Sequence, residues 1–321
     1  MAETCAADSL IHGAAGSVLE WRNCRIPRMV LGTAQMGMPY GIANTNTGSP
    51  SASAAREVVA AAWECGVRFF DTAQAYGESE RFLGTAIGSL AVEGAHLISK
   101  LHPALDPADA RAILRSVEES VERLGRPLWA MLLHQPVWLA AWDRGLGEAL
   151  GEAQRQGLVK HLGASVYTVE EARSVLAHPA MEMVQAPASA WDQRMLRDGI
   201  FNLAAAEDKL CFVRSIYLQG LLLLPAGRVA KRLAFARGAS EQWERLARRY
   251  GMAAGELAVR CALSLPVPAV VGMETADQVR ENARLFALEP LSKSELDEIH
   301  TTMAAVLDER TLNPSSWGAP E

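Results

Sequence analysis

Hydrophobic and polar positions alternate along the chain in two kinds of segment. Short runs of β-branched and apolar residues are separated by longer stretches with helical spacing of apolar positions. Such alternation is typical of a parallel sheet covered by helices. Eight runs predict strands, at residues 29–34, 69–72, 97–100, 130–134, 161–166, 183–186, 212–216 and 269–272.

The stretches between these runs predict helices at residues 52–65, 78–89, 108–124, 144–156, 169–177, 195–206, 240–250 and 276–286, with another at 293–306. Asp106 and Pro107 suit the start of the third helix as N-cap and first-turn residue, and Gly66 and Gly125 suit helix ends. Eight strand–helix units predict an α/β fold, a closed (β/α)8 barrel of the TIM type.

We expect a single barrel domain over residues 17–308, between a flexible N-terminus (1–16) and a C-terminal tail (309–321). At the start of the barrel, Val18, Leu19 and Trp21 precede the turn-like pair Arg22-Asn23, and Ile26 follows it. This pattern predicts a short hairpin at the base of the barrel.

Composition excludes several classes of protein. The 321 residues are 50% hydrophobic and 21% charged, which is enough to bury one large core. The net charge of -6 and the scattered Lys and Arg residues give no basic face for nucleic acid. Apolar runs fall short of the roughly 20 residues that a membrane helix needs. The N-terminus, with Glu3 and Asp8, lacks a signal-peptide layout, so we expect a cytoplasmic protein.

Cysteine and histidine spacings do not predict a metal site. The five cysteines are odd in number and form no CxxC pair, as expected of reduced thiols. The seven histidines form no HExxH motif and no close pair at zinc-ligand spacing. We therefore expect no metal, and the sequence does not fix the oligomeric state.

Polar residues stand where several predicted strands end, which is where a barrel of this kind places its active site. The second strand ends in Phe70-Asp71-Thr72 and continues to Tyr76, the third ends at Lys100, and the fourth ends at His134. We expect Asp71, Tyr76, Lys100 and His134, called the rim tetrad below, to converge on one rim.

Each member of the rim tetrad also has a purely structural interpretation. Asp71 could cap a helix, Tyr76 could pack against the core, and Lys100 could extend its ammonium to solvent. His134 could be satisfied within the core. Taken together these interpretations weaken, because burying a lysine costs several kcal/mol unless a carboxylate pairs with it. Asp71 on the neighbouring strand is placed to do so.

The rim tetrad has the chemistry to protonate a carbonyl group. A phenol has a pKa of about 10, and an adjacent ammonium lowers that value. Lys100 would therefore make Tyr76 a better acid, and His134 could hydrogen-bond the carbonyl oxygen. Hydride would have to come from elsewhere.

The segment Phe70-Asp71-Thr72-Ala73-Gln74-Ala75-Tyr76-Gly77 resembles the aldo-keto reductase motif, in which Asp and Tyr stand five residues apart. Ile98-Ser99-Lys100-Leu101 and Leu133-His134-Gln135-Pro136 match the family's Lys and His strand ends, and the resemblance runs from Leu31 to Asn282. It implies an oxidoreductase that moves hydride between a nicotinamide cofactor and a small aldehyde, ketone or sugar-like substrate. It implies Tyr76 as the general acid.

The resemblance also implies a cofactor site along the barrel's rim. The cofactor-binding positions that match are Gly32, Thr33, Asp71, Ser165, Gln185, Gln219, Gly220, Gly272, Gln278, Glu281 and Asn282. Among them Ser165 and Gln185 match the residues that hold the carboxamide. Val166 and Arg214 depart from the family, which commonly has Asn and a stacking aromatic there. A planar guanidinium can stack too, so Arg214 is kept as a cofactor contact.

The choice between the two nicotinamide cofactors is balanced. The family commonly uses NADP(H) and places Lys or Arg near its 2′-phosphate, where this chain has Gly272 and Gln278, and Glu274 adds a negative charge. Arg280 lies two residues beyond Gln278, and such residues point to different sides of a helix. We expect a weak preference for NADP(H), with NAD(H) possible.

The substrate pocket and the enzymatic role leave alternatives open. Tyr40, Trp138, Trp142 and Trp191 lie on loops that follow strands, and each could line the pocket or pack inside the fold. Some members of the family, such as ion-channel accessory subunits, keep barrel and cofactor but act as sensors. A metal-assisted hydrolase built on Asp71 and His134 would leave Tyr76 and Lys100 unexplained.

Overall fold

The structure, a computed structural model, describes residues 18–43, 51–314 and 317. It contains all eight predicted strands as a closed parallel barrel in which β10 pairs with β3, so that prediction is confirmed. The barrel strands are β3 (Met29–Gly32), β4 (Phe69–Asp71), β5 (His96–Lys100), β6 (Leu128–Leu133), β7 (Val159–Ser165), β8 (Met183–Pro187), β9 (Leu210–Arg214) and β10 (Ala269–Gly272).

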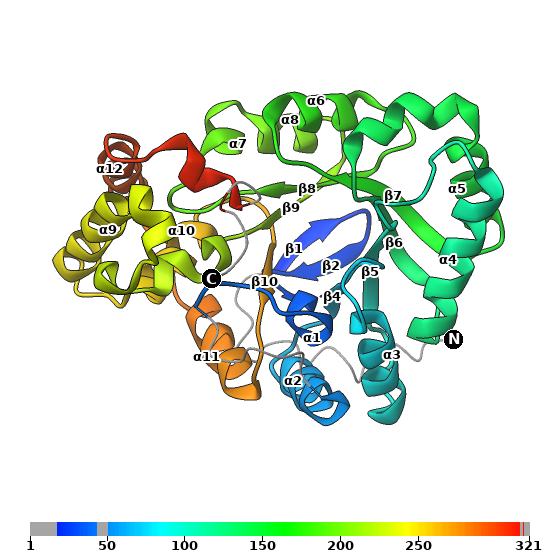
Figure 1. Cartoon of the computed structure of the whole chain (residues 1–321), viewed down its shortest axis with the longest axis horizontal. Helices are drawn as coiled ribbons and strands as arrows, with labels where there is room; N and C mark the ends of the chain where they lie inside the picture. Colours follow the sequence, from blue (N-terminus) through cyan, green and yellow to red (C-terminus); the bar gives the residue numbers. More distant parts are fainter. Residues whose placement is uncertain (1–17, 44–50, 315–316, 318–321) are drawn as a thin grey trace.

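Helices form a ring around the barrel (Figure 1). They are α1 (Ala34–Gly37), α2 (Ala52–Glu64), α3 (Ser79–Ser89), α4 (Ala110–Leu124), α5 (Leu146–Arg155), α6 (Val169–Ala177), α7 (Arg194–Arg197), α8 (Ile200–Ala206), α9 (Arg237–Arg249), α10 (Ala254–Leu263), α11 (Ala276–Phe286) and α12 (Lys293–Ala304). Short 3₁₀ segments are η2 (Pro136–Arg144), η3 (Leu218–Leu223), η4 (Ala226–Arg228), η5 (Lys231–Ala236) and η6 (Glu309–Leu312). Within the described ranges, none of the helices has the length and apolar character needed to cross a bilayer.

Several helices differ from the sequence-based expectation. Helix α1 was not predicted, and α9 begins at Arg237 rather than at residue 240. Helix α4 begins later, because Asp109 is its N-cap and accepts from the Ala112 amide at 3.0 Å, while Asp106 accepts from Ala108 in the preceding turn. The helix expected at 195–206 is divided into α7 and α8 by Gly199, whose φ is 69°. Helix α10 was not predicted; most of its residues are apolar and buried.

The predicted hairpin is present and lies over the centre of the barrel in Figure 1. Strands β1 (Val18–Trp21) and β2 (Cys24–Pro27) are joined by Arg22 and Asn23, both with positive φ, as a tight two-residue turn requires. Trp21 and Ile26 are buried with the inward-facing strand residues, and the Trp21 ring lies 6.0 Å from that of Trp129. The hairpin therefore closes the base of the barrel.

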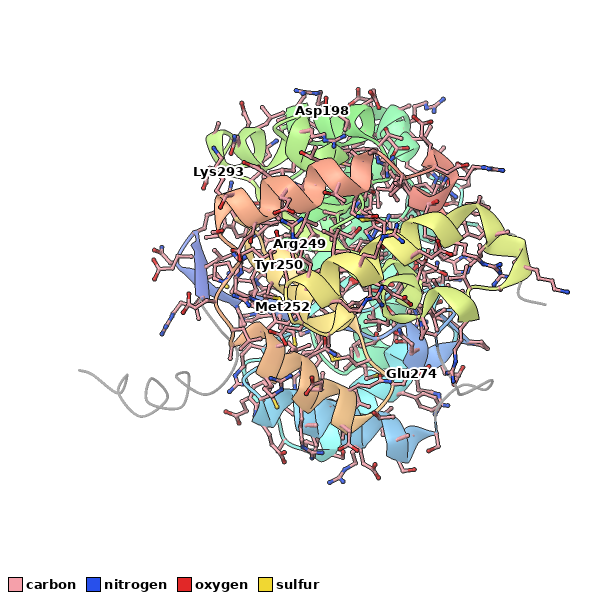
Figure 2. All side chains as sticks on the ribbon, turned by 90° about the vertical axis from the view of Figure 1, so that its left-hand side faces the viewer. Asp198, Arg249, Tyr250, Met252, Glu274 and Lys293 are labelled. Carbon is pink, nitrogen blue, oxygen red and sulfur yellow. The ribbon has the colours of Figure 1, made fainter. Side chains whose placement is uncertain are left out.

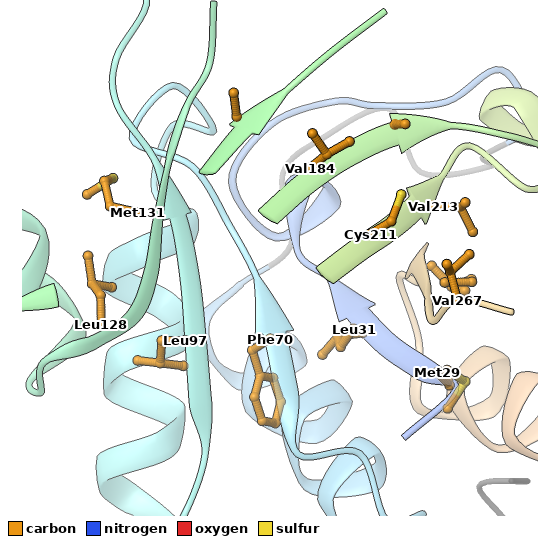
Figure 3. Packing of buried hydrophobic residues seen from close by; sticks show 14 of the residues in the cluster. Met29, Leu31, Phe70, Leu97, Leu128, Met131, Val184, Cys211, Val213 and Val267 are labelled. Atoms are coloured by element: carbon orange, nitrogen blue, oxygen red, sulfur yellow. The ribbon is translucent and has the colours of Figure 1, made fainter. Parts of the chain in front are cut away.

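Barrel side chains alternate between two cores, as the pleat of a strand requires. Met29, Leu31 and Phe70 face the surrounding helices (Figure 3). Their neighbours Val30 and Phe69 belong to a second cluster inside the barrel. This parity decides which residue at each strand's carboxyl end faces the barrel axis.

A third core lies between α9, α10 and α12. Arg249 and Tyr250, at the end of α9, lie beside α12 in Figure 2 and both contact Glu298 of that helix, at 2.5 and 2.9 Å. Trp317 also packs here with 5% of its surface exposed, and its indole donates to the Arg310 carbonyl. Within the predicted C-terminal tail, residues 309–312 therefore form η6 and Trp317 packs against this core, whereas the expected flexible N-terminus lies outside the described residues.

Candidate active site

One inward-facing residue from each barrel strand forms a layer at the carboxyl rim. The alternation that buries Val30, Phe69 and Ile98 inside the barrel turns the residues two positions later toward the same axis. This top layer consists of Gly32, Asp71, Lys100, His134, Ser165, Gln185, Arg214 and Gly272. The sequence singled out all eight, three of them as members of the rim tetrad.

Asp71 and Lys100 form the buried ion pair that the sequence predicted. The ammonium lies 2.5 Å from both carboxylate oxygens and donates to the Thr72 carbonyl at 2.8 Å. Both side chains are nearly inaccessible to solvent, and the Gln185 amide donates to the same carboxylate at 3.1 Å. The Asp71 carboxylate is thus engaged by Lys100 and Gln185, which does not suit the metal ligand that a hydrolase built on Asp71 and His134 would need.

Tyr76 is half-buried beside this pair, in the turn after β4. Its ring centroid lies 5.1 Å from the Lys100 ammonium and 6.1 Å from the His134 ring, which meets it edge-on. Burial and then the negative charge of Asp71 raise the pKa of Tyr76, and Arg214 partly opposes them. The expectation that Lys100 lowers this pKa is therefore not met, because Asp71 neutralises the ammonium. The phenol stays protonated at neutral pH, the form that can donate a proton.

His134 is neutral in this environment. Burial, followed by the positive charges of Lys100 and Arg214, lowers the pKa of His134 to about 4. Its Nδ1 is buried and has no hydrogen-bond partner among the described residues. A neutral imidazole has one donor and one acceptor nitrogen, so His134 can hydrogen-bond a ligand without adding charge.

Two glycines that the sequence analysis did not single out fix the turn that carries Tyr76. A Cβ at Gly37 of α1 would overlap the Tyr76 carbonyl oxygen and would lie 2.5 Å from the Ser79 amide. Gly77, at φ 53°, packs its backbone against Gly37 in turn. This close backbone approach is possible only without side chains, and a glycine directly after Tyr76 is the sequence signal for it.

A cavity of about 520 Å³ extends from the rim tetrad across the ends of β3 and β10 to α10 and α11. The predicted site residues that line it are Gly32, Thr33, Tyr40, Asp71, Tyr76, Gln185, Arg214, Gln219, Gly220, Gly272, Gln278, Glu281 and Asn282. Lys100, His134 and Ser165 are not part of its lining. Ser165 is buried directly beside Gln185 in the strand register, and Lys100 lies against Asp71.

Glycines line the wall of the cavity and leave room for an extended ligand. Gly32, Gly220 and Gly272 leave it smooth, and a Cβ at Gly272 would collide with the Gln35 amide. The Gln35 Oε1 atom is buried and unpartnered in the described part of the chain, so it can accept from a ligand. Gly220 has a φ of 93°, and a Cβ there would lie 2.5 Å from that of Ala43. Gln35 was not predicted.

The far end of the cavity is organised by Tyr217, which the sequence analysis also missed. Its hydroxyl donates to Asn282 at 2.6 Å, and the Asn282 amide donates to the Gln278 carbonyl at 2.8 Å. The Gln278 side chain accepts from the amide of Glu274, which lies just before α11 (Figure 2), at 2.7 Å. The predicted Gln278 and Asn282 are thus held in place before any ligand arrives.

Charges at this end are mainly negative. Glu256, Asp277 and Glu281 line the cavity, and Arg284 lines it while paired with Glu281 at 2.8 Å. Arg280 pairs with Asp277 at 3.2 Å and is not part of the lining, as its helical spacing predicted. Glu256 and Arg284 lie on helix faces that the sequence analysis did not assign to the site.

The tryptophans proposed for the substrate pocket lie elsewhere. Trp138 is buried in the main core, and Trp191 is buried against Trp243, with ring centroids 6.4 Å apart. Trp142 is half-buried against His178. Neither Trp138 nor Trp191 lines the cavity, because both large apolar rings are buried in the hydrophobic cores. Tyr40 is the member of that set that reaches it.

Comparison with known proteins places this geometry in a family. The Aldo/keto reductase family model matches residues 28–303. "Protein REDOX 2" of Catharanthus roseus is 28% identical over 262 residues, covering 73% of this chain and 76% of the relative.

Solved structures share the fold at low identity. The glycerol dehydrogenase AKR11B4 from Gluconobacter oxydans superposes with a TM-score of 0.71 at 20% identity, covering 92% of this chain and 97% of that one. The aldo-keto reductase AKR11C1 from Bacillus halodurans gives 0.72 at 19% identity, covering 93% and 100%. With the family model spanning most of the barrel, this chain belongs to the aldo/keto reductase family of oxidoreductases.

Proposed function

We propose that this protein transfers hydride reversibly between a nicotinamide cofactor and the carbonyl group of a small aldehyde, ketone or sugar-like compound. The observation that carries the proposal is the position of Tyr76 and the Asp71–Lys100 pair at the head of a glycine-walled cavity. We also propose that the protein acts in the cytoplasm.

Tyr76 is the general acid in this proposal. When bound, the nicotinamide ring supplies the hydride. The Tyr76 hydroxyl gives its proton to the carbonyl oxygen as negative charge develops there, and neutral His134 hydrogen-bonds the same oxygen. The Asp71–Lys100 pair fixes the electrostatic surroundings of the phenol.

Other residues of the rim would hold the cofactor. Gln185 of the lining, together with Ser165 beside it in the strand register, would bind the carboxamide, Gln219 and Gly220 would bind the pyrophosphate, and Arg214 would lie against the nicotinamide ring. Gly272, Gln278, Glu281 and Asn282 would meet the adenosine. The family habit favours NADP(H), but the carboxylates of Glu256, Asp277 and Glu281 oppose a 2′-phosphate. We therefore propose that the preference for NADP(H) is small and that NAD(H) is also used.

A substrate panel tests the proposal. Purified protein is mixed with NADPH or NADH and a set of aldehydes, ketones and sugars, and loss of the reduced cofactor is followed by absorbance. We expect steady turnover that depends on Tyr76. A protein that binds cofactor tightly, measured by fluorescence titration, yet turns over none of the panel would instead act as a sensor of the kind known in this family.

A further inference from the structure

Arg214 is held rigidly in the top layer, at the end of β9. Its guanidinium lies 4.5 Å from the centre of the Tyr167 ring, which covers one of its faces. One terminal nitrogen donates to the Val166 carbonyl at 3.0 Å and the other donates to the Ser215 hydroxyl at 3.3 Å. These bonds use two of the five N–H donors of a guanidinium, so donors remain for a ligand in the cavity.

The other charged groups of the cavity wall have partners of opposite charge nearby. Asp71 is paired with Lys100, Asp277 with Arg280, and Glu281 with Arg284. Glu256 has Arg260 at 3.9 Å. Within the described ranges, Arg214 has no carboxylate within ion-pair distance and contacts only a carbonyl, a hydroxyl and a ring. A half-buried cation without a counter-charge is costly, and an anion bound beside it would offset that cost.

The charge of Arg214 acts at the place where the carbonyl would react. Burial raises the pKa values of Tyr40 and Tyr76 and lowers those of Lys100 and His134; the charge of Arg214 partly opposes the rise for the two phenols and adds to the lowering for Lys100 and His134. Arg214 lies in the same top layer as Asp71 and lines the same cavity as Tyr76. A group bound by Arg214 would therefore sit close to the carbonyl carbon that receives hydride.

We propose that Arg214 binds a carboxylate of the substrate, so that the preferred substrates are carbonyl compounds carrying a carboxylate near the carbonyl group. A planar guanidinium can offer two parallel N–H groups to a carboxylate, and such charge-assisted pairs are strong and directional. This inference rests on the proposed reductase function and names its substrate class. The pyrophosphate of the cofactor is the other anion that could reach Arg214, and the experiment separates the two.

The test compares an oxo acid with its methyl ester, which keeps the carbonyl and removes the charge. For the unaltered enzyme we expect kcat/KM to be at least ~10-fold higher for the acid. Arg214→Leu also removes the contact with the nicotinamide ring, so it should lower kcat/KM for both compounds, by roughly 10- to 100-fold more for the acid than for the ester. Arg214→Lys keeps the positive charge but lacks the two parallel N–H groups of a guanidinium. It should therefore restore part of the difference in kcat/KM between the acid and the ester. Arg284→Leu, at the opposite end of the same cavity, should change the KM of the cofactor and leave the acid-to-ester ratio unchanged.

Two results would overturn the inference. If the unaltered enzyme reduces the ester as well as the acid, no carboxylate is recognised. If Arg214→Leu loses activity equally on both compounds and binds the cofactor more weakly, Arg214 serves the pyrophosphate. Calorimetry of the oxo acid with the protein–cofactor complex covers the remaining case, in which no carbonyl compound is turned over. Binding that depends on Arg214 would then support the site while the proposed reductase function fails, and absence of binding would reject both.

Discussion

Tyr76 has a hydroxyl whose removal should affect chemistry and little else. Tyr76→Phe keeps the half-buried ring against His134, so the cavity and the cofactor contacts should be preserved. We expect turnover to fall by ~10²-fold or more, the scale of losing a general acid, while cofactor affinity stays the same. Steady-state rates and fluorescence titration measure the two quantities, and unchanged turnover would remove Tyr76 from its proposed role.

Lys100 should matter for stability as well as for activity. Lys100→Met leaves the Asp71 carboxylate buried without its cation, and breaking such a pair costs about 3–5 kcal/mol. We expect both turnover and melting temperature to drop.

The double variant Asp71→Asn/Lys100→Met is the matched control for this prediction. It removes both charges, so it should regain much of the lost stability but not the activity. Thermal melts of the single and double variants give the comparison. Equal melting temperatures for the unaltered protein and Lys100→Met would mean that the pair adds nothing to the stability of the fold.

At the scale of elements, α1 and the turn after β4 are locked together by Gly37. Gly37→Ala would force a side chain into the Tyr76 carbonyl and the Ser79 amide, which must move the turn. We expect kcat to fall by ~10-fold or more, because small displacements of reacting groups are costly. Gly88→Ala in α3 is the control, since nothing lies within 4 Å of a Cβ there. A Gly37→Ala enzyme with full activity would show that the turn tolerates displacement.

The negative end of the cavity, built by α10 and α11, should influence cofactor choice. Glu256→Gln removes one carboxylate from the lining, so kcat/KM for NADPH should rise several-fold relative to that for NADH. Glu241→Gln removes the same charge from the exposed face of α9 and should leave the ratio as it was. If both variants raise the NADPH-to-NADH ratio of kcat/KM equally, the effect comes from net charge and not from the cavity lining. A tenfold preference of the unaltered enzyme for NADH would show that the acidic side chains outweigh the preference for NADP(H) that is common in the family.

At the scale of the whole molecule, buried neutral histidines should make stability depend on pH. The pKa values of His134 and His300 are lowered to about 4, mainly by burial, from an ordinary value near 6.5. The unfolded chain therefore binds more protons, and this contribution is complete above about pH 6.5 and is lost as the pH falls toward 4. A shift of this size corresponds to about 3 kcal/mol for each histidine over that range, and solvent screening should reduce it to roughly 1–2 kcal/mol because both side chains are only half-buried.

Urea unfolding at several pH values tests this dependence. The double variant His134→Asn/His300→Asn should show a smaller loss of unfolding free energy between pH 7 and pH 4 than the unaltered protein. Carboxylates that titrate in the same range affect both proteins alike, so the difference between the two curves isolates the histidines. Curves of equal slope would contradict the prediction.

Prediction from the sequence succeeded where the spacing of residues along the chain alone determines the structure. Apolar runs gave the eight strands, and polar residues at strand ends gave the top layer, because strand parity follows from spacing alone. It was weaker where the outcome depends on distant partners. The effect of Asp71 on Tyr76 follows from a contact with Lys100, and the burial of Trp138 and Trp191 follows from the packing of separate helices. Gln35 and Tyr217 were missed because only the closed barrel brings them to the cavity.

The seam between β3 and β10 has a consequence for synthesis of the protein. These strands pair from Met29 with Ala269 to Gly32 with Gly272, and the Ala269 amide donates to the Arg28 carbonyl at 2.8 Å. The edge of β3 that pairs with β10 therefore stays uncovered until β10, the last barrel strand, has been synthesised. While the ribosome is still adding the intervening residues, that edge offers unpaired backbone groups to other chains. A nascent chain that ends before β10 is thus the species most exposed to aggregation, and the one that chaperones have most reason to bind.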